Sequence, residues 1–393
     1  MPRKRILVKS IDTSISYQVI GIDLAKHLVS ACLITGAGEI FGIDRLTYDD
    51  LLKSAERMSP TLFCMEPCPE VHYLAEKLQG YGHHTKVIDG AAVKEYIKTH
   101  FGGQKTDLND AQAIAFLSLD TNLPEITPKN TSNSVLSSIQ AVREQFRKEY
   151  IQSFVSLKGI CQRWGLPISK GVMNKNKVEE LVSESKKIPQ EVKDWLLELL
   201  QSCRELQKRL NKISKYLKEY ADNDEICQKI MSVPGIGPIT ATRLKATIGD
   251  IQRFEKPKSI VAYYGLVPKS KATEHNEKKG GITHRGDRVA RSLLIEGAGV
   301  VLNLAAKGFL RSKPLNKWIE KKRKLKMPWG KLCCALAAKM LRIVRAILIQ
   351  GTSFNAKIAG VARCSLPKES RNNVMGNNKL SEIPSPNGSV YIH

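Results

Sequence analysis

The first 125 residues alternate short apolar runs with amphipathic stretches, and this alternation restricts the possible folds more than any other feature of the sequence. Short apolar runs between turn signals predict strands, whereas apolar residues spaced three and four apart predict helices. The predicted strands are 17–23, 29–35, 39–43, 61–66 and 84–89, and the predicted helices are 47–58, 71–80, 91–99 and 108–119. The first three strands form a meander. We therefore expect an α/β domain over residues 15–125.

Four acidic residues stand where these elements end or begin. Asp23 ends the strand of VIGIDLAKH, and Glu66 ends the strand of LFCMEPCPE. Asp107 and Asp110 open the helix of KTDLNDAQAIAF and share one face, because they are three residues apart. Each residue alone would be ordinary at a strand end or in the first turn of a helix. Together they offer the oxygen ligands that Mg²⁺ or Mn²⁺ prefers, and such ions support in-line phosphoryl displacement.

The charge balance points to a polyanionic partner. Lys and Arg number 62 against 38 Asp and Glu, which gives a formal net charge of +24. Nucleic acid is the expected partner of such a chain. The longest apolar stretches fall short of the roughly 18 residues that a membrane span needs, and no signal peptide is recognised. We expect a cytoplasmic protein associated with the nucleoid and not with a membrane.

Residues 130–225 read as long helices. Apolar residues recur there at alternating spacings of four and three, namely Val192, Leu196, Leu199, Cys203, Leu206, Leu210, Ile213 and Leu217. This is the pattern of a heptad seam. It fits a coiled coil between two copies of the chain, and it also fits a helical hairpin within one chain. Self-association through this region, as a dimer or tetramer, is the first expectation.

Residues 226–351 are expected to form a mainly helical, basic domain. Its segment VPGIGPITATRLK places Gly235 and Gly237 in a turn before a helix, which resembles a helix-hairpin-helix element able to hold a phosphate. The alternative is that the two glycines only form a turn between helices and bind no phosphate. Between Arg311 and Lys331 nine Lys or Arg stand against Glu320 alone, interleaved with Trp318 and Trp329, a pattern that favours nucleic-acid binding. Residues 352–393 are rich in Ser, Asn, Pro and Gly and predict a flexible tail.

Several motifs together resemble the IS110/IS1111-type transposases, which are DEDD recombinases, and the related pilin-gene-inverting DNA invertases. The motifs are GIDLAK, the EPC turn, KTDLNDA, and the GITHRGD run that begins at Gly281. The resemblance covers residues 17–306. It implies a RuvC-like, ribonuclease H-related first domain whose Asp-Glu-Asp-Asp set corresponds to Asp23, Glu66, Asp107 and Asp110. It also implies a transposase-20-like second domain, DNA strand breakage and rejoining, and in some members a structured guide RNA.

The DNA-binding and joining residues are expected in the second domain. Nucleic-acid contacts are expected from Gly235, Gly237, Lys278, Lys279, Arg285, Arg288 and Arg291. The family joins DNA through a serine, but a gap-free count from Gly265 places Ala272 at that position. Thr273 and Ser270 are the nearest hydroxyls. This departure leaves two further readings open, a catalytically impaired nucleic-acid-binding relative and a metal-dependent DNA nuclease that does not rejoin strands.

Overall fold

A mixed sheet dominates the N-terminal part of the chain. The structure, a computed structural model, describes residues 6–26, 28–120, 125–126, 131–168, 175–273 and 276–358, of which 125–126, 175–176, 270–273 and 276–279 are described by their backbone alone. The strands are β1 (Ile6–Leu7), β2 (Tyr17–Leu24), β3 (Leu28–Thr35), β4 (Ile40–Thr47), β5 (Leu62–Met65), β6 (His84–Ile88) and β7 (Glu125–Ile126). They lie in the order β1-β4-β3-β2-β5-β6-β7. Strands β2, β3 and β4 form the predicted antiparallel meander, and β5 and β6 extend it in parallel beside β2.

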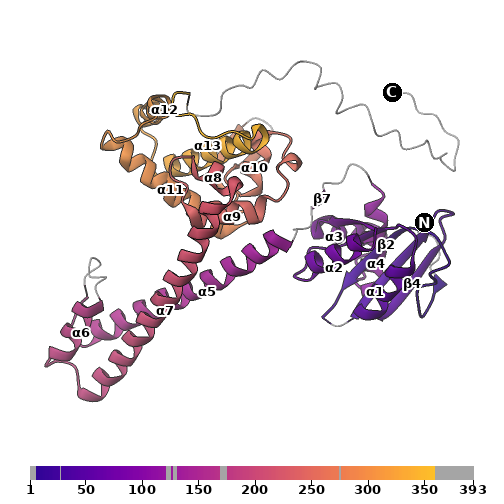
Figure 1. Cartoon of the computed structure of the whole chain (residues 1–393), viewed down its shortest axis with the longest axis horizontal. Helices are drawn as coiled ribbons and strands as arrows, with labels where there is room; N and C mark the ends of the chain where they lie inside the picture. Colours follow the sequence, from indigo (N-terminus) through magenta and orange to yellow (C-terminus); the bar gives the residue numbers. More distant parts are fainter. Residues whose placement is uncertain are drawn as a thin grey trace.

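Helices cover both faces of this sheet (Figure 1). Helices α1 (Tyr48–Arg57) and α2 (Val71–Gly80) pack on one face, and α3 (Gly90–His100) and α4 (Asp107–Ser118) pack on the other. Neighbouring residues of a strand point to opposite faces, so Ile20 contributes to the first apolar cluster and Val19 to the second. The predicted strands and helices of this part are confirmed. The mixed sheet with flanking helices is consistent with the RuvC-like domain that the resemblance implies.

Helix α4 lies unusually close to β2. A Cβ atom built on Gly21 would stand 2.4 Å from the carbonyl oxygen of Ala111 and 2.5 Å from the backbone nitrogen of Ala115. Every residue of α4 from Asn109 to Ala115 is buried, so this part of the helix is a core element without an exposed stripe. The absence of a side chain at Gly21 therefore allows the backbone of α4 to rest directly on the central strand.

The middle of the chain is a pair of long antiparallel helices. Helices α5 (Thr131–Arg163) and α7 (Gln190–Asn223) pack along their length, and α6 (Lys175–Glu184) closes the far end. The heptad seam of α7 faces α5. Leu196 lies in one cluster with Leu157, and Cys203 lies in another with Phe154. The expected coiled coil between chains is therefore not what fills this seam, because α5 of the same chain buries it; the internal hairpin is observed instead.

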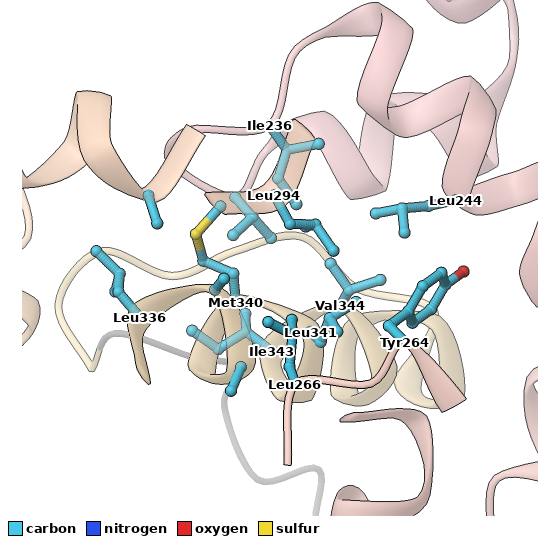
Figure 2. Packing of buried hydrophobic residues seen from close by; sticks show 14 of the residues in the cluster. Ile236, Leu244, Tyr264, Leu266, Leu294, Leu336, Met340, Leu341, Ile343 and Val344 are labelled. Carbon is cyan, nitrogen blue, oxygen red and sulfur yellow. The ribbon is translucent and has the colours of Figure 1, made fainter. Parts of the chain in front are cut away.

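The C-terminal part is mainly helical, as expected, and has its own core. Its elements are α8 (Glu225–Met231), α9 (Pro238–Ile248), the 3₁₀ turn η1 (Ile251–Arg253), α10 (Pro257–Tyr263), β8 (Pro268–Thr273), β9 (Asn276–Ile282), α11 (Arg288–Ala306), α12 (Lys313–Lys324) and α13 (Trp329–Gln350). Figure 2 shows Met340, Leu341 and Val344 of α13 packed among Leu294, Ile236 and Leu244. The antiparallel hairpin of β8 and β9 was not anticipated from the sequence.

Helix α11 is long and apolar enough to cross a membrane by length and composition. In the structure it packs against α13, and its residues Leu294, Ala298 and Val301 are fully buried in the C-terminal core. One side of the helix, 33% of this apolar stretch, is thus buried inside the protein.

The first residues of the expected tail, 352–358, contact the folded C-terminal part of the chain. Phe354 packs against the C-terminal core, and its backbone nitrogen donates to the hydroxyl of Ser232 at 2.8 Å. The hydroxyl of Ser312 donates to the carbonyl oxygen of Ala356 at 2.7 Å. Residues 352–358 are thus part of the folded chain, and residues 359–393 lie outside the described residues.

Replacing Gly21 by alanine tests the contact between β2 and α4. The new methyl group would meet backbone atoms that cannot move aside, so the helix has to shift. We expect the free energy of unfolding to fall by roughly 1–3 kcal/mol, the usual effect of overpacking. Denaturant unfolding followed by circular dichroism measures it. Gly36→Ala is the matched control, because a Cβ there meets nothing within 4 Å; equal stability of the two variants would contradict the assignment.

Candidate metal centre

Two carboxylates lie at the same end of two neighbouring parallel strands. Asp23 is the seventh residue of β2, and Glu66 directly follows β5. The register pairs Ile22 with Met65, so the residues that follow these two emerge next to each other at the sheet edge. Both side chains are half-buried. The strand ends thus supply the first half of the predicted set.

The other two carboxylates come from the first turn of α4. Thr106 caps this helix, and its hydroxyl accepts a hydrogen bond from the backbone nitrogen of Asn109 at 3.1 Å. Asp107 is exposed, whereas Asp110 is only 5% exposed. Since α4 rests on β2 at Gly21, its first turn reaches the edge where β2 ends.

The four acids influence one another electrostatically. Burial raises the pKa of Asp23 to about 6, and the negative charges of Asp110, Asp107 and Glu66 contribute to this increase. Burial, followed by the charge of Asp110, also raises the pKa of Glu66. The pKa of Asp110 is raised by burial and Asp107, although Lys105 opposes the change. The structure therefore brings all four predicted carboxylates into one electrostatically coupled group.

Positive charge surrounds this group without neutralising it. The ammonium of Lys105 lies 3.7 Å from Oδ2 of Asp110, but its side chain is 76% exposed, so the ion pair is a weak one. Lys94, in α3, lowers the pKa of Glu66 through its charge. Lys94 was missed by sequence reasoning. The signal that could have found it is its position in α3, the helix that directly follows β6.

The donor set fits a hard divalent cation. Oδ1 of Asp110 is buried and has no hydrogen-bond partner among the described residues, an arrangement that normally costs free energy unless a ligand completes it. Carboxylate oxygens are the ligands that Mg²⁺ and Mn²⁺ select. Among the described residues, however, no three acidic, His or Cys side chains stand close enough to hold an ion as they lie. Charge and donor chemistry fit the metal, whereas the present side-chain spacing is not that of a bound ion.

The C-terminal residues predicted to bind nucleic acid differ in their surroundings. Arg285 and Arg288 are exposed. Arg291 is 6% exposed, and its guanidinium donates to the carbonyl oxygens of Tyr264 at 3.1 Å and Arg285 at 2.6 Å. As it lies, Arg291 holds the loop before α11 in place.

Gly235 and Gly237 also differ. A Cβ on Gly235 would stand 2.6 Å from the carbonyl oxygen of Gly297, so this residue allows the turn before α9 to pack on α11. A Cβ on Gly237 would meet nothing within 4 Å.

The candidate hydroxyls lie on the β-hairpin. Ser270 pairs with Lys279 in the register of β8 and β9, and Thr273 pairs with Asn276. The side chains of Ser270, Thr273, Lys278 and Lys279 lie outside the described ones. The four carboxylates are therefore gathered by the fold, and the hydroxyls are located by their backbone alone.

Two family models match the chain in the order of these parts. A transposase model of the DEDD type of IS110 elements matches residues 20–162, which include all four carboxylates. The model described as the transposase IS116/IS110/IS902 family matches residues 227–311, which include the β-hairpin and α11.

Curated relatives align along most of the chain. A "Probable family 20 transposase" of Pseudomonas aeruginosa is 28% identical, with 85% of this chain and 98% of the relative covered. The "Transposase for insertion sequence element IS1111A" of Coxiella burnetii is 27% identical over 86% of this chain and 91% of its own length. The "Pilin gene-inverting protein" of Moraxella bovis is 21% identical over 86% and 98%. With both halves matched in order and whole relatives aligned, the chain belongs to the IS110 family of transposases.

Proposed function

We propose that this protein breaks and rejoins DNA strands in transposition or site-specific recombination, with a divalent metal held by Asp23, Glu66, Asp107 and Asp110. The observation that carries the proposal is the coupled carboxylate group at the ends of β2 and β5 and the start of α4, in a chain with a net charge of +24. Membership of a transposase family supports action on DNA. The pilin-gene-inverting relatives support recombination as the broader class.

Each group of residues has a separate task in this proposal. A bound Mg²⁺ or Mn²⁺ would stabilise charge on the attacking and leaving oxygens of a phosphodiester. The four carboxylates hold that ion, and Lys105 and Lys94 limit their mutual repulsion. Arg285, Arg288, Lys278 and Lys279 hold the DNA backbone from the other end of the chain, together with the turn at Gly237. Arg291 and Gly235 act by supporting this surface, because their contacts are internal.

The joining step needs a nucleophile, and the two candidates are Ser270 and Thr273 of β8. Ala272 stands where the family's serine is expected by a gap-free count, which favours a second candidate function. In that alternative the protein is a metal-dependent nuclease that cuts without rejoining. A recombination assay that records nicked as well as rejoined products separates the two functions.

Partners follow from the same proposal. DNA is the first, and a structured guide RNA is the second anionic ligand that so basic a chain can bind. Association with DNA would place the protein in the cytoplasm at the nucleoid. A homo-oligomer that uses the helical middle would need a surface other than the buried seam, such as the face of α5 that exposes Ile151 and Val155.

Asp23→Asn is expected to abolish recombination while sparing DNA binding. Asparagine keeps the size of the side chain but removes the charge that holds the metal, so recombination in cells should fall by about two orders of magnitude or more. Affinity for DNA should stay within a few fold. Asp49→Asn, an exposed acid in the first turn of α1, is the matched control. Undiminished recombination by Asp23→Asn would refute the catalytic assignment.

The raised pKa of Asp23 predicts a pH effect on stability. Its pKa is about 6 in the folded protein and 3.8 in the ordinary case, so the folded state holds the proton more tightly than the unfolded state does. The free energy of unfolding should therefore decrease as pH rises from about 4 to about 7 without metal. Melting temperatures of the wild type and Asp23→Asn, measured across this range, test it.

The asparagine variant should gain stability relative to wild type as pH rises, and Mg²⁺ should stabilise the wild type alone. A parallel pH dependence of the two proteins would show that Asp23 titrates normally.

DNA affinity should depend steeply on salt. Each phosphate that the protein neutralises contributes a slope of roughly −0.9 to log K against log salt. Arg288→Gln should reduce that slope by about one unit without changing sequence preference. Lys53→Gln, an exposed cation of α1, should leave the slope unchanged. Fluorescence anisotropy at a series of salt concentrations measures the slope, and an unchanged value for Arg288→Gln would remove this residue from the DNA-binding surface.

A further inference from the structure

A cavity of about 890 Å³ opens in the C-terminal part of the protein. It is lined by residues of α11, α12, α13 and the base of the β-hairpin. Figure 1 shows the three helices together in the C-terminal part of the chain. The volume is within the range of roughly 300–1,000 Å³ that small-molecule sites occupy. None of the four carboxylates lines it.

Small residues keep the cavity open. Helix α13 presents one face to it, because Cys334, Ala335 and Ala338 are spaced one, three and four residues apart and all line the cavity. Gly280 and Gly281 of β9 also line the cavity. Larger side chains at these five positions would fill the space. Ile295 and Met327 complete the apolar floor.

One aromatic ring stands in the wall of the cavity. Trp318, in α12, is partly buried and lines the cavity, and the ammonium of Lys339 lies 5.6 Å from the centre of its ring. A ring that is held by packing and faces an open space is a stacking surface for a flat partner. Tryptophan stacks well on any nucleobase, since every base has a π face.

The charges of the lining are all of one sign. Lys322, Lys331, Lys339 and Arg342 line the cavity, and the described lining residues include no Asp or Glu. None of these four cations forms an ion pair with an acid whose side chain is described. Burial and the nearby Arg342 lower the pKa of Lys339, which shows that the cations oppose one another. An anion would relieve this repulsion.

We propose that this cavity binds an unpaired nucleotide of a single-stranded nucleic acid, with its base stacked on Trp318 and its phosphate held by Lys339, Lys331 and Arg342. The inference rests on the proposed function and adds to it a site for a strand that has left the duplex. An apolar peptide could pack against the apolar residues of the cavity but would leave the cations without an anionic partner. DNA and RNA share the recognised chemistry, and the experiment below distinguishes them.

The cavity lies next to the hairpin that carries the candidate hydroxyls. Pro268 and Ile282 are paired at the base of the hairpin, and both line the cavity. Ser270 is two residues further along β8, a distance of about 7 Å along a strand. A nucleotide held in the cavity would therefore anchor its strand next to the hairpin that carries the candidate hydroxyls.

The test compares single strands with a duplex. Fluorescence anisotropy with the full-length protein gives affinities for a labelled single-stranded DNA, an RNA of the same sequence and the matching blunt duplex. We expect Trp318→Leu to weaken single-strand binding by about five- to a hundredfold, the usual effect of losing one stacked base. Duplex affinity should change by less than about threefold. The stronger effect on DNA or on RNA identifies the natural strand.

Two further variants keep the test independent of folding. Ala335→Leu fills the cavity without changing any charge or removing the indole from the core, and it should produce the same selective loss. Trp195→Leu is the matched control, because Trp195 is a tryptophan of α7, is 76% exposed and does not line the cavity. It should bind all three ligands as the wild type does.

The outcomes separate this inference from the proposed function. Wild-type single-strand affinity in both Trp318→Leu and Ala335→Leu would overturn the nucleotide site, even if the protein recombines DNA. Equal losses on single strand and duplex would overturn it as well, since they would indicate a general phosphate surface. A wild-type protein that binds single strands through the cavity but never recombines DNA would instead refute the proposed function alone.

Discussion

The close contact between α4 and β2 is the constraint on which the candidate site depends. Asp23 and Glu66 are placed by the strands that carry them, but Asp107 and Asp110 are on a helix that follows another helix, α3, and not a strand. That helix can approach β2 at the distance of direct backbone contact only because residue 21 is glycine. The first turn of α4 then reaches the edge where β2 ends. A side chain at this position would separate the acids that the strands and the helix bring together.

The contact has an electrostatic consequence. Bringing buried carboxylates together raises their pKa values, and the folded chain holds the group at the expense of stability. Lys105 opposes part of this increase, but Oδ1 of Asp110 has no partner among the described residues. Such an arrangement is typical of sites in which a function is retained against a cost in stability. A divalent ion is the simplest ligand that would satisfy both the charge and the unpartnered oxygen.

Local sequence patterns predicted most of the strands and helices. The features that they did not predict depend on packing between segments that are distant in the sequence. The strands from Tyr17 to Ile88 and the helices between them were predictable because each carries its own periodicity. The heptad seam of α7 was also visible, but periodicity shows only that a stripe is buried and not which helix covers it. Phe354 sits in a polar stretch, so nothing local indicated that it reaches the C-terminal core. The cavity beside Trp318 depends on three helices and a hairpin, which no single segment reveals.

The carboxylates and most of the clustered cations lie in different parts of the chain, and electrostatics gives a reason for this separation. A group of four acids repels a DNA backbone, so it cannot provide the affinity that brings the substrate in. In the proposed function the affinity comes from residues such as Arg285, Arg288 and the cations of α12 and α13, which are remote in sequence from the acids. Binding and catalysis are then separable by mutation. Neutralising an acid removes repulsion between protein and DNA, so the affinity of such a variant for DNA should be retained or slightly increased. If the variant then loses recombination, the acid acts in the chemical step and not in DNA binding.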